Sequence, residues 1–438
     1  MTSQSYKYKH AIVIGGSITG LLTARVLSDH FAQVTILERD PVHNVPESRK
    51  GQPQTRHLHA LLAQGLYIFK EYFPGIEDEL VAGGAVIGDM AERMHWYQYG
   101  GYRLRFKSGL TNISMSRPFL ELCVRRRVLG LPNITLIDSC AADELIANPA
   151  KTQVIGVRAS NRSFEADLVV DTSGRGSSAL KWLDGLGYAR PQETQVRSNI
   201  GYATREYRRA PKDANATRVE MISPTAPHEK HGTFIFPVED NRWIMTAGGY
   251  VGDHPPSTEA GLLEFVRTLS APDVYNIISQ AEPLTDIVTY KYAASLRRHY
   301  EKLDRFPEGF LVLGDAMASF NPIYGQGMTS AAMQTHALKY GLQNNSGLQG
   351  LWRAHFKQAA KVVDMPWQLT VGEDFRYPET EGVKPPLTDT LNGYVDRVHK
   401  ATQRDPVVYG QFLRVMNLMS PPTSLMSPRI MWRVLMGR

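Results

Sequence analysis

The chain has 438 residues, of which 42% are hydrophobic and 21% charged. This composition is that of a folded globular protein and excludes collagen-like and wholly disordered chains. The formal net charge is +6, and the stretch from His399 to Arg438 holds six basic residues against one acidic residue. The body of the chain is therefore nearly neutral and its tail is basic, a pattern that predicts no nucleic-acid partner.

The two cysteines, Cys123 and Cys140, are too few for a disulfide framework or a cysteine-rich metal site, so we expect buried thiols and no metal. The sequence contains no run of 18 apolar residues, so no transmembrane helix is expected. The apolar run at residues 11–14 is too short for a signal peptide. These features predict a protein of the reducing cytoplasm.

The N-terminal segment predicts a strand, a glycine-rich turn, a helix and a second strand. Apolar residues 11–14 are followed by two glycines, as is typical of a buried parallel strand. Apolar side chains repeat at helical spacing over residues 18–27, and the β-branched run 34–37 ends at Glu38. A loop over residues 41–54 and a helix over residues 57–69 are predicted next.

The middle of the chain is predicted to be rich in strands. Gly100 and Gly101 favour a hairpin over residues 94–106, and Ser116 and Pro118 are the capping and first-turn residues of a helix. That helix is expected to end near Leu129. The further predictions are strands at 134–138, 153–159, 163–171, 233–237 and 243–246, and a helix at 262–269.

An α/β pattern returns with a buried strand at residues 310–313 and a helix over residues 325–339. The rest is predicted to be mainly helical, with a Pro/Gly-rich interruption at residues 377–386. Because the α/β pattern surrounds a β-rich middle, we expect one nucleotide-binding domain with a second domain inserted into it.

The first group of residues with chemical meaning lies at the N-terminal turn. It follows the pattern of a dinucleotide-binding turn, in which glycines admit a pyrophosphate to a helix N-terminus and an acidic residue binds the ribose. The alternative for that acidic residue is an exposed carboxylate at a strand end. The residues are Gly15, Gly16, Ser17, Gly20 and Glu38, with Ser17 at the position of the middle glycine.

The second group follows the strand at residues 310–313. Asp315 stands at the strand end, and Gly325, Gly327 and Met328 begin the next helix. A carboxylate there can accept hydrogen bonds from ribityl hydroxyls, and a helix N-terminus can stabilise negative charge on a reduced flavin. Together the two groups predict FAD that is held at both ends.

These motifs resemble FAD-dependent monooxygenases of the aromatic-hydroxylase type, over roughly residues 10–340. Residues 51–62 are most similar to the bacterial epoxidases of polyether biosynthesis, of the lasalocid and monensin type. The resemblance rests on the turn at 15–20 with Glu38 and Arg39, on Ser116 and Arg117, on residues 171–174, and on Gly314, Asp315, Pro322 and residues 325–328.

The resemblance implies an α/β fold: a Rossmann-like FAD-binding domain, an inserted β-rich substrate domain and a helical C-terminal region. The glycine turn, Glu38 and Arg39 would hold the ADP half of FAD, and Arg117 the pyrophosphate or ribityl chain. Asp171 would contribute from its own motif, and the second group would hold the ribityl chain and flavin ring. The implied regions are 1–90, 110–195 and 300–345 for FAD, 91–109 and 196–299 for substrate, and 346–438 for the helices.

The implied reaction is insertion of one oxygen atom from O2, through a C4a-hydroperoxyflavin, into an apolar polyketide, terpenoid or aromatic secondary metabolite. Epoxidation and hydroxylation both remain open. Thr172 stands where such enzymes usually have glycine, and Met317 where they usually have histidine. The first departure leaves two electron routes open, NAD(P)H directly or a partner flavin reductase.

The catalytic and substrate residues are less determined by the sequence. His57 and His59 are candidates to face the flavin or assist proton transfer, and the alternative is a purely structural role in the loop. Alternating aromatic residues in strands are also often simple core. The candidates to line a substrate pocket are Trp96, Phe234, Phe236 and Met245.

The basic tail ends in an amphipathic segment at residues 428–436, with Arg429 and Arg433 four residues apart beside a broad apolar face. Such a helix can lie at a membrane interface or receive a lipid-like substrate. The alternative is a helix that docks on the protein while its arginines extend to water.

Other functions also fit an FAD frame. One is a flavin dehydrogenase or double-bond reductase of isoprenoid lipids, and another is a non-catalytic flavin-binding or membrane-associated module. A flavin halogenase is disfavoured because its Trp-x-Trp-x-Ile-Pro stretch is absent from the sequence.

Overall fold

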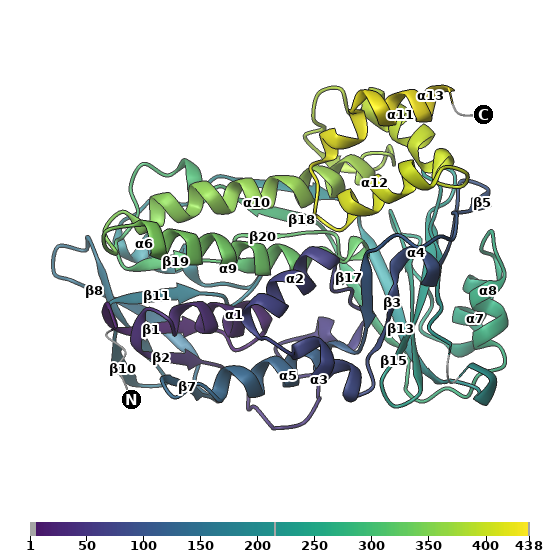
Figure 1. The fold of residues 1–438 in the computed structure, drawn as a ribbon. Helices are drawn as coiled ribbons and strands as arrows, with labels where there is room; N and C mark the ends of the chain where they lie inside the picture. Colours follow the sequence, from purple (N-terminus) through teal and green to yellow (C-terminus); the bar gives the residue numbers. More distant parts are fainter. Residues whose placement is uncertain (1–5, 214–215, 437–438) are drawn as a thin grey trace.

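The structure is a computed structural model that describes residues 6–213 and 216–436, so Arg438 of the basic tail lies outside the described residues. It confirms the predicted α/β class, with a parallel sheet at one end, a larger mixed sheet at the other and helices between and above them (Figure 1).

Five parallel strands form the sheet that carries the N-terminus. Strands that are distant in sequence are neighbours in this sheet, so their ends meet at one edge. Ile14, for example, pairs with both Leu37 and Asp171. The predicted strands at the N-terminus and near residues 134 and 310 all belong to this sheet. In spatial order it comprises β19 (Phe310–Val312), β11 (Leu168–Asp171), β1 (Tyr8–Ile14), β2 (Phe31–Leu37) and β7 (Ile134–Ile137).

The single strand predicted at residues 163–171 is wrong: it is two strands in two sheets. Between the two strands, the Asp167 carboxylate accepts hydrogen bonds from the backbone N–H groups of Lys9 and His10. These bonds hold the chain where it leaves a small antiparallel sheet and joins the parallel one. The antiparallel sheet comprises β10 (Arg162–Glu165), β9 (Val154–Ala159) and β8 (Ala142–Ala147).

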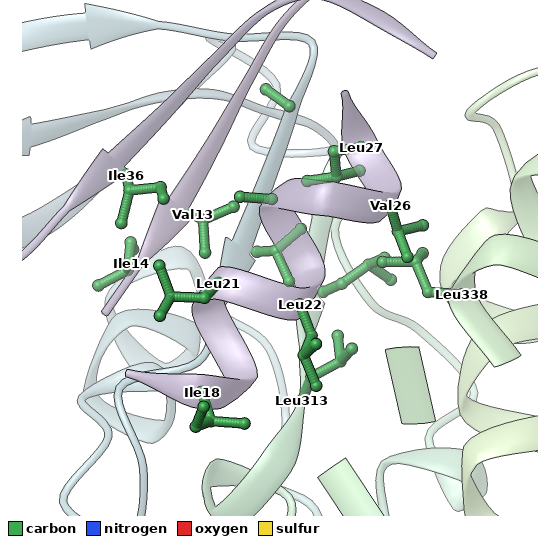
Figure 2. Packing of buried hydrophobic residues seen from close by; sticks show 14 of the residues in the cluster. Val13, Ile14, Ile18, Leu21, Leu22, Val26, Leu27, Ile36, Leu313 and Leu338 are labelled. Atoms are coloured by element: carbon green, nitrogen blue, oxygen red, sulfur yellow. The ribbon is translucent and has the colours of Figure 1, made fainter. Parts of the chain in front are cut away.

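Helix α1 (Ile18–Leu27) has the predicted bounds and is almost wholly buried. Leu21 packs against the strands that carry Val13 and Ile36, while Leu22 and Val26 face Leu313 and Leu338 on the other side (Figure 2). Apolar contact on two sides fixes the direction of α1, and with it the turn at its N-terminus. The helices that pack on it are α5 (Arg117–Leu129), α9 (Gly327–Asn344) and α2 (Ala63–Tyr72), with α10 (Leu351–Asp374) on α9.

The helix predicted over residues 57–69 begins six residues later, as α2. A short 3₁₀ turn, η1 (Pro53–Arg56), precedes it, and the residues between the two are not helical. The His57 ring and the Leu58 backbone N–H hydrogen-bond the hydroxyls of Thr204 and Thr246 in the larger sheet. These tertiary contacts hold the segment in an extended course that helical periodicity alone does not reveal.

The larger sheet has seven strands, and α7 (Glu259–Arg267) and α8 (Asp273–Ile278) cover one of its faces (Figure 1). The predicted hairpin and the two strands near residues 233 and 243 are confirmed within it. Its strands are β17 (Val288–Tyr292), β13 (Ile200–Arg208), β16 (Arg242–Gly249), β15 (His231–Val238), β14 (Val219–Ile222), β4 (Met94–Gln98) and β5 (Gly101–Tyr102).

The remaining elements are short helices and the strands of two smaller antiparallel sheets. They comprise α3 (Ile76–Ala82), α4 (Met90–Arg93), α6 (Ala179–Leu186), β3 (Val86–Asp89), β6 (Thr111–Ser114), β12 (Glu193–Arg197), β18 (Ser295–Arg298), β20 (Ala318–Ser319) and β21 (Glu381–Gly382).

The last part of the chain is helical, with the predicted interruption before residue 388. These helices lie together at the top of the view in Figure 1, above one end of the seven-stranded sheet. None of the helices within residues 6–213 and 216–436 has both the length and the apolar character that a bilayer span requires. The elements are α11 (Thr388–Ala401), α12 (Pro406–Met416), η6 (Pro422–Met426) and α13 (Pro428–Met436).

The closest backbone approach at the N-terminal turn gives a stability prediction. A Cβ on Gly20 would overlap the carbonyl oxygen of Gly15, whereas a Cβ on Gly185, which is also helical, meets open space. Gly20→Ala is expected to lower the free energy of unfolding by about 1–3 kcal/mol. Gly185→Ala is expected to raise it by about 0.5–1 kcal/mol. Denaturant unfolding of both variants measures the difference, and equal effects would contradict the close approach.

Candidate active site

A cavity of about 1540 Å³ is lined by residues of the parallel sheet, the seven-stranded sheet and the C-terminal helices. Pockets for single small molecules usually have roughly 300–1,000 Å³. The volume therefore leaves room for an extended cofactor and a second molecule.

One end of the cavity is the glycine-rich turn between β1 and α1. Gly15 has φ +103°, and a Cβ there would lie 3.0 Å from the carbonyl oxygen of Thr172. The Thr172 hydroxyl donates to the carbonyl oxygens of Ile14 and Gly15, at 2.8 and 3.2 Å. Thr172, which stands where the resembling enzymes usually have glycine, thus holds the turn in place through these two hydrogen bonds.

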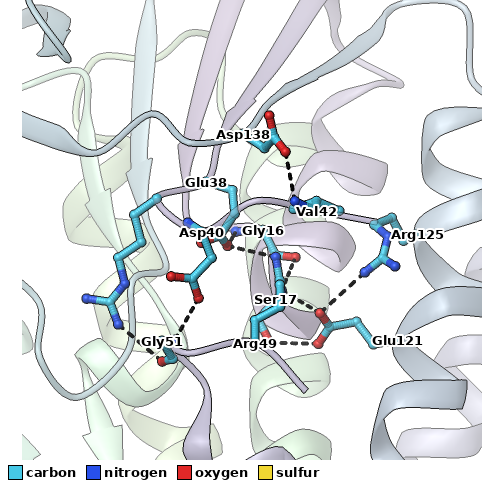
Figure 3. A network of polar contacts seen from close by, with 12 residues as sticks. Gly16, Ser17, Glu38, Asp40, Val42, Arg49, Gly51, Glu121, Arg125 and Asp138 are labelled. Atoms are coloured by element: carbon cyan, nitrogen blue, oxygen red, sulfur yellow. Dashed lines mark hydrogen bonds and ion pairs between the residues drawn. The ribbon is translucent and has the colours of Figure 1, made fainter. Parts of the chain in front are cut away.

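Two buried carboxylates hold the segments around this turn together (Figure 3). Glu38 accepts the backbone N–H of Gly16 at 2.8 Å and forms an ion pair with Arg49 at 3.3 Å. Arg49 also donates to the Glu121 carboxylate at 2.5 Å and to the Gly16 carbonyl at 3.2 Å. Arg49 and Glu121 are not predictable from the sequence, because a lone arginine in a polar loop and a mid-helix glutamate belong to no motif.

Arg117 follows the N-cap Ser116 at the start of α5, as predicted, and lines the cavity. Its Nη2 donates to the Ser17 hydroxyl at 3.0 Å and pairs with Glu121 at 3.2 Å. Its Nη1 is buried without a hydrogen-bond acceptor, and burial lowers the pKa of the guanidinium. An unpartnered buried donor is costly, so this atom is suited to an anionic ligand in the cavity.

Asp315 and the start of α9 form the middle of the cavity. The Asp315 side chain is open to the cavity, and desolvation raises its pKa to about 6 against the opposing charges of Arg175 and Arg117. A Cβ on Gly327 would meet open space, and Met328 also lines this part. The N-terminal N–H groups of α9 therefore stand beside an open volume, where they favour negative charge.

Other predicted cofactor residues divide into two sets. Arg39 and Gly325 line the cavity, whereas Asp171 does not. The Asp171 carboxylate is fully buried, accepts from the Ser173 backbone N–H and from the hydroxyls of Ser173 and Ser177, and has its pKa raised by burial. Asp171 shapes the cavity-lining loop after β11, so any contribution to cofactor binding would be indirect.

Gly16 and Gly20 of the turn also do not line the cavity. Gly16 turns its N–H to Glu38, and Gly20 allows α1 to approach the turn. Both glycines shape the turn that lines the cavity, and their contact with a cofactor stays a prediction.

His57 and His59 both line the cavity beside the larger sheet. Desolvation lowers the pKa of His57 to about 3 and that of His59 to about 4, so both rings are neutral near pH 7. The His57 Nδ1 lies 2.8 Å from the Thr204 hydroxyl, and its Nε2 is buried without a partner. A neutral ring with one unused nitrogen can hydrogen-bond a ligand but does not provide a cation.

The far end of the cavity is apolar and aromatic. Trp96, Phe234 and Phe236, the candidates for a substrate pocket, line this end. Met245 does not, because it pairs with Ile235 on the face of the sheet that α7 and α8 cover. Its prediction as a pocket residue is wrong, since side chains alternate between the two faces of a strand.

The C-terminal helices complete this apolar end, which the sequence analysis did not predict. Their contribution depends on contacts between segments more than 150 residues apart in sequence, such as the 5.9 Å approach of the Trp96 and Phe412 rings. The residues from these helices that line the cavity include Leu369, Tyr394, His399, Phe412, Leu413, Met416 and Leu425.

Within the described residues, three side chains of metal-ligand type gather outside the cavity. Ligand atoms of His95, Glu220 and Asp273 lie within 4.8 Å of one another. Arg218 forms an ion pair with Glu220, and Tyr102 donates to Asp273 at 2.5 Å. Both carboxylates thus already have a protein partner, so the cluster by itself does not indicate a metal site.

No protein-family model matches the chain. It is 33% identical over 427 residues to Protein Rv3254 of Mycobacterium tuberculosis (strain ATCC 25618 / H37Rv), covering 94% of this chain and 90% of that protein. The chain belongs to the same family as Protein Rv3254. That name states no activity, so membership in the family leaves the reaction to be argued from the site.

Solved structures of known flavoproteins have a similar fold. PqsL, a probable FAD-dependent monooxygenase from Pseudomonas aeruginosa, has a TM-score of 0.62 and 17% identity, over 84% of this chain and 97% of that chain. The flavin-dependent brominase Bmp2 has a TM-score of 0.62 and 12% identity, over 93% of both chains. The fold of this chain is thus that of FAD-binding monooxygenases.

The buried neutral state of His57 predicts a pH dependence of stability. Since the pKa is about 3 in the folded protein and near 6.5 in the unfolded chain, only the unfolded chain gains this proton as the pH falls below 6.5. His57 therefore destabilises the fold by about 1.4 kcal/mol per pH unit between pH 6 and pH 4. His57→Asn is expected to remove that slope. Urea unfolding across this pH range measures it, and parallel losses in both proteins would contradict the assignment.

Proposed function

We propose that the protein is an FAD-dependent monooxygenase that inserts one oxygen atom of O2 into an apolar small molecule. One observation carries the proposal: a single cavity joins a dinucleotide-type turn to an aromatic, apolar chamber. The fold shared with PqsL adds to it, because PqsL is described as a probable FAD-dependent monooxygenase.

The residues of the cavity fit FAD. The unpartnered Nη1 of Arg117 is suited to a pyrophosphate oxygen, and the Glu38 carboxylate, which lines the cavity, retains lone pairs for ribose hydroxyls. Asp315 would accept from the ribityl hydroxyls, and the first N–H groups of α9 would face the flavin ring. When bound and reduced, FAD supplies the reactivity toward O2 that amino-acid side chains lack.

The chain itself would position the substrate and exclude water. The aromatic chamber keeps the reacting carbon in an apolar environment, where competing reactions with water are suppressed. The neutral His57 would orient a polar atom of the substrate or cofactor through its free Nε2. Its pKa of about 3 argues against proton donation from a charged imidazole near pH 7.

The finer features of the reaction are also proposals. The apolar end fits a terpenoid, polyketide or aromatic metabolite, and the resemblance at residues 51–62 favours epoxidation over hydroxylation. Electrons would come from NAD(P)H, directly or through a partner flavin reductase. Thr172 supports the route through a reductase. Its side chain fills the space next to the turn that a glycine, the usual residue in the resembling enzymes, would leave open.

Halogenation is the second candidate, because Bmp2 has a similar fold. A halogenase needs a lysine near its substrate to deliver hypohalous acid, and the cavity-lining lysine of the described chain is Lys50. Lys50 adjoins Gly51, which hydrogen-bonds Arg39 and Asp40 at the dinucleotide end. Its position beside the expected cofactor favours oxygenation over halogenation.

Arg117 gives the sharpest test of the cofactor. Arg117→Met is expected to weaken FAD binding at least tenfold, because it removes a buried charge-assisted hydrogen bond. The matched control is Arg126→Met on the exposed side of the same helix, which should leave the affinity unchanged. Fluorescence titration of the apoprotein with FAD measures both. Equal affinity in all three proteins would contradict the placement of the pyrophosphate.

The reaction class is tested with the FAD-loaded protein, an electron donor with and without a flavin reductase, and a panel of apolar alkenes and aromatics. Consumption of O2 with one isotopically labelled oxygen atom in the product is expected. Reduction of the substrate without O2 uptake would support a double-bond reductase, and a brominated product in the presence of bromide would support a halogenase. Either result would overturn the proposal.

A further inference from the structure

The C-terminal helix α13 has apolar residues on two opposite faces. Its inner face docks on the protein through Ile430 and Val434, each 4% exposed. The docked helix foreseen as one alternative is therefore present. A helix that only docks would carry polar residues outward. Here the outward residues other than Arg429 include four large apolar side chains: Met431, Trp432, Leu435 and Met436, exposed at 39%, 66%, 47% and 67%.

Elements that contact α13 form part of the rim of the cavity. Helix α13 contacts both η6 and α11. Met426 of η6 and Leu391 of α11 line the cavity and are also exposed, at 39% and 41%. Leu387, just before α11, is 73% exposed. Exposed apolar side chains therefore stand on α13 and on elements that contact it, and two of them line the cavity. The helices α11 and α13 lie together at the top of Figure 1.

Basic residues accompany the apolar face. Arg429 is exposed on α13 beside Trp432, and Lys400 and Arg414 are exposed on the neighbouring helices. Arg433 is held by an ion pair with Asp405 at 2.7 Å. A tryptophan-containing apolar face with arginine at its flank is the arrangement of helices that lie in the interface of an anionic bilayer.

We propose that the outer face of α13, with the adjoining rim, docks on an anionic lipid bilayer and that the apolar substrate enters the cavity from there. Docking depends only on the exposed apolar face and its basic flank. Delivery of a substrate from the bilayer also rests on the proposed monooxygenase function. A second copy of the chain is a poorer occupant, because a symmetric contact would bring two basic tails together.

The test uses the full-length FAD-loaded protein in flotation with phosphatidylcholine vesicles, with and without phosphatidylglycerol. We expect flotation with the anionic vesicles, at least tenfold weaker binding to the neutral ones, and loss of binding as salt is raised. Trp432→Gln combined with Leu435→Gln should weaken binding at least tenfold while Ile430 and Val434 keep α13 docked.

Two further variants make the result specific. Arg429→Glu should weaken binding to anionic vesicles about tenfold and leave binding to neutral vesicles unchanged. Tyr340→Gln is the matched control, because Tyr340 is an exposed aromatic residue (56%) on a different helix, α9, close in sequence to Asn345, which hydrogen-bonds Lys7. This variant should bind vesicles as the wild type does. An unchanged FAD spectrum shows that each variant is folded.

Three results would overturn docking: wild-type protein that does not float, a double variant that floats equally well, or a wild-type dimer in solution that the double variant abolishes. Docking and the proposed function fail separately. A protein that oxygenates its substrate but ignores vesicles overturns docking alone. A protein that floats but binds no FAD overturns the monooxygenase proposal and the delivery of substrate that rests on it, while docking stands.

Discussion

Helix α1 crosses the turn after β1 so closely that residue 20 has no room for a side chain, and the rest of the site depends on this contact. Gly15 and Gly20 make the approach possible, and Thr172 fixes the turn from the neighbouring strand. The apolar contacts of α1 on both sides then set the direction of its N-terminus. As a result, free backbone N–H groups and the guanidinium of Arg117 stand at one end of a large cavity.

Buried charge reinforces this arrangement. Glu121 contacts Arg49, Arg117 and Arg125 within one cluster, and Glu38 binds Arg49 from the other side. Taking these groups from water is costly, and their mutual contacts offset that cost only when the geometry is good. The cluster therefore ties the loop after β2 to α5, and it leaves the Nη1 of the cavity-lining Arg117 buried without a protein partner.

Sequence reasoning succeeded where the signal was local. The turn with Glu38, the capped helix at Arg117, and Asp315 with the start of α9 are each contained in a short segment, and members of all three line the cavity.

It failed where the outcome depends on contacts between distant segments. Asp171 does not itself line the cavity, whereas its neighbours in the loop do. Met245 was assigned to the wrong face because the register with β15 decides which way it points. The contribution of Phe412 and Leu425 depends on helices folding back over a strand more than 300 residues earlier, which no local pattern encodes.

The two ends of the cavity explain why one chain combines polar motifs with an apolar C-terminal region. The polar end offers donors and carboxylates that suit a dinucleotide, while the aromatic end offers a dry surface for an apolar molecule. The neutral state of His57 and His59, whose pKa values burial lowers to about 3 and about 4, adds no further charge to the cavity.

A crystal structure of the flavin-loaded protein tests this account most directly. The account predicts the adenosine ribose at Glu38, the pyrophosphate within hydrogen-bond distance of Arg117 Nη1, and the flavin ring between the N-terminus of α9 and the aromatic chamber. A flavin bound elsewhere, or bound with its ring at Glu38, would contradict it.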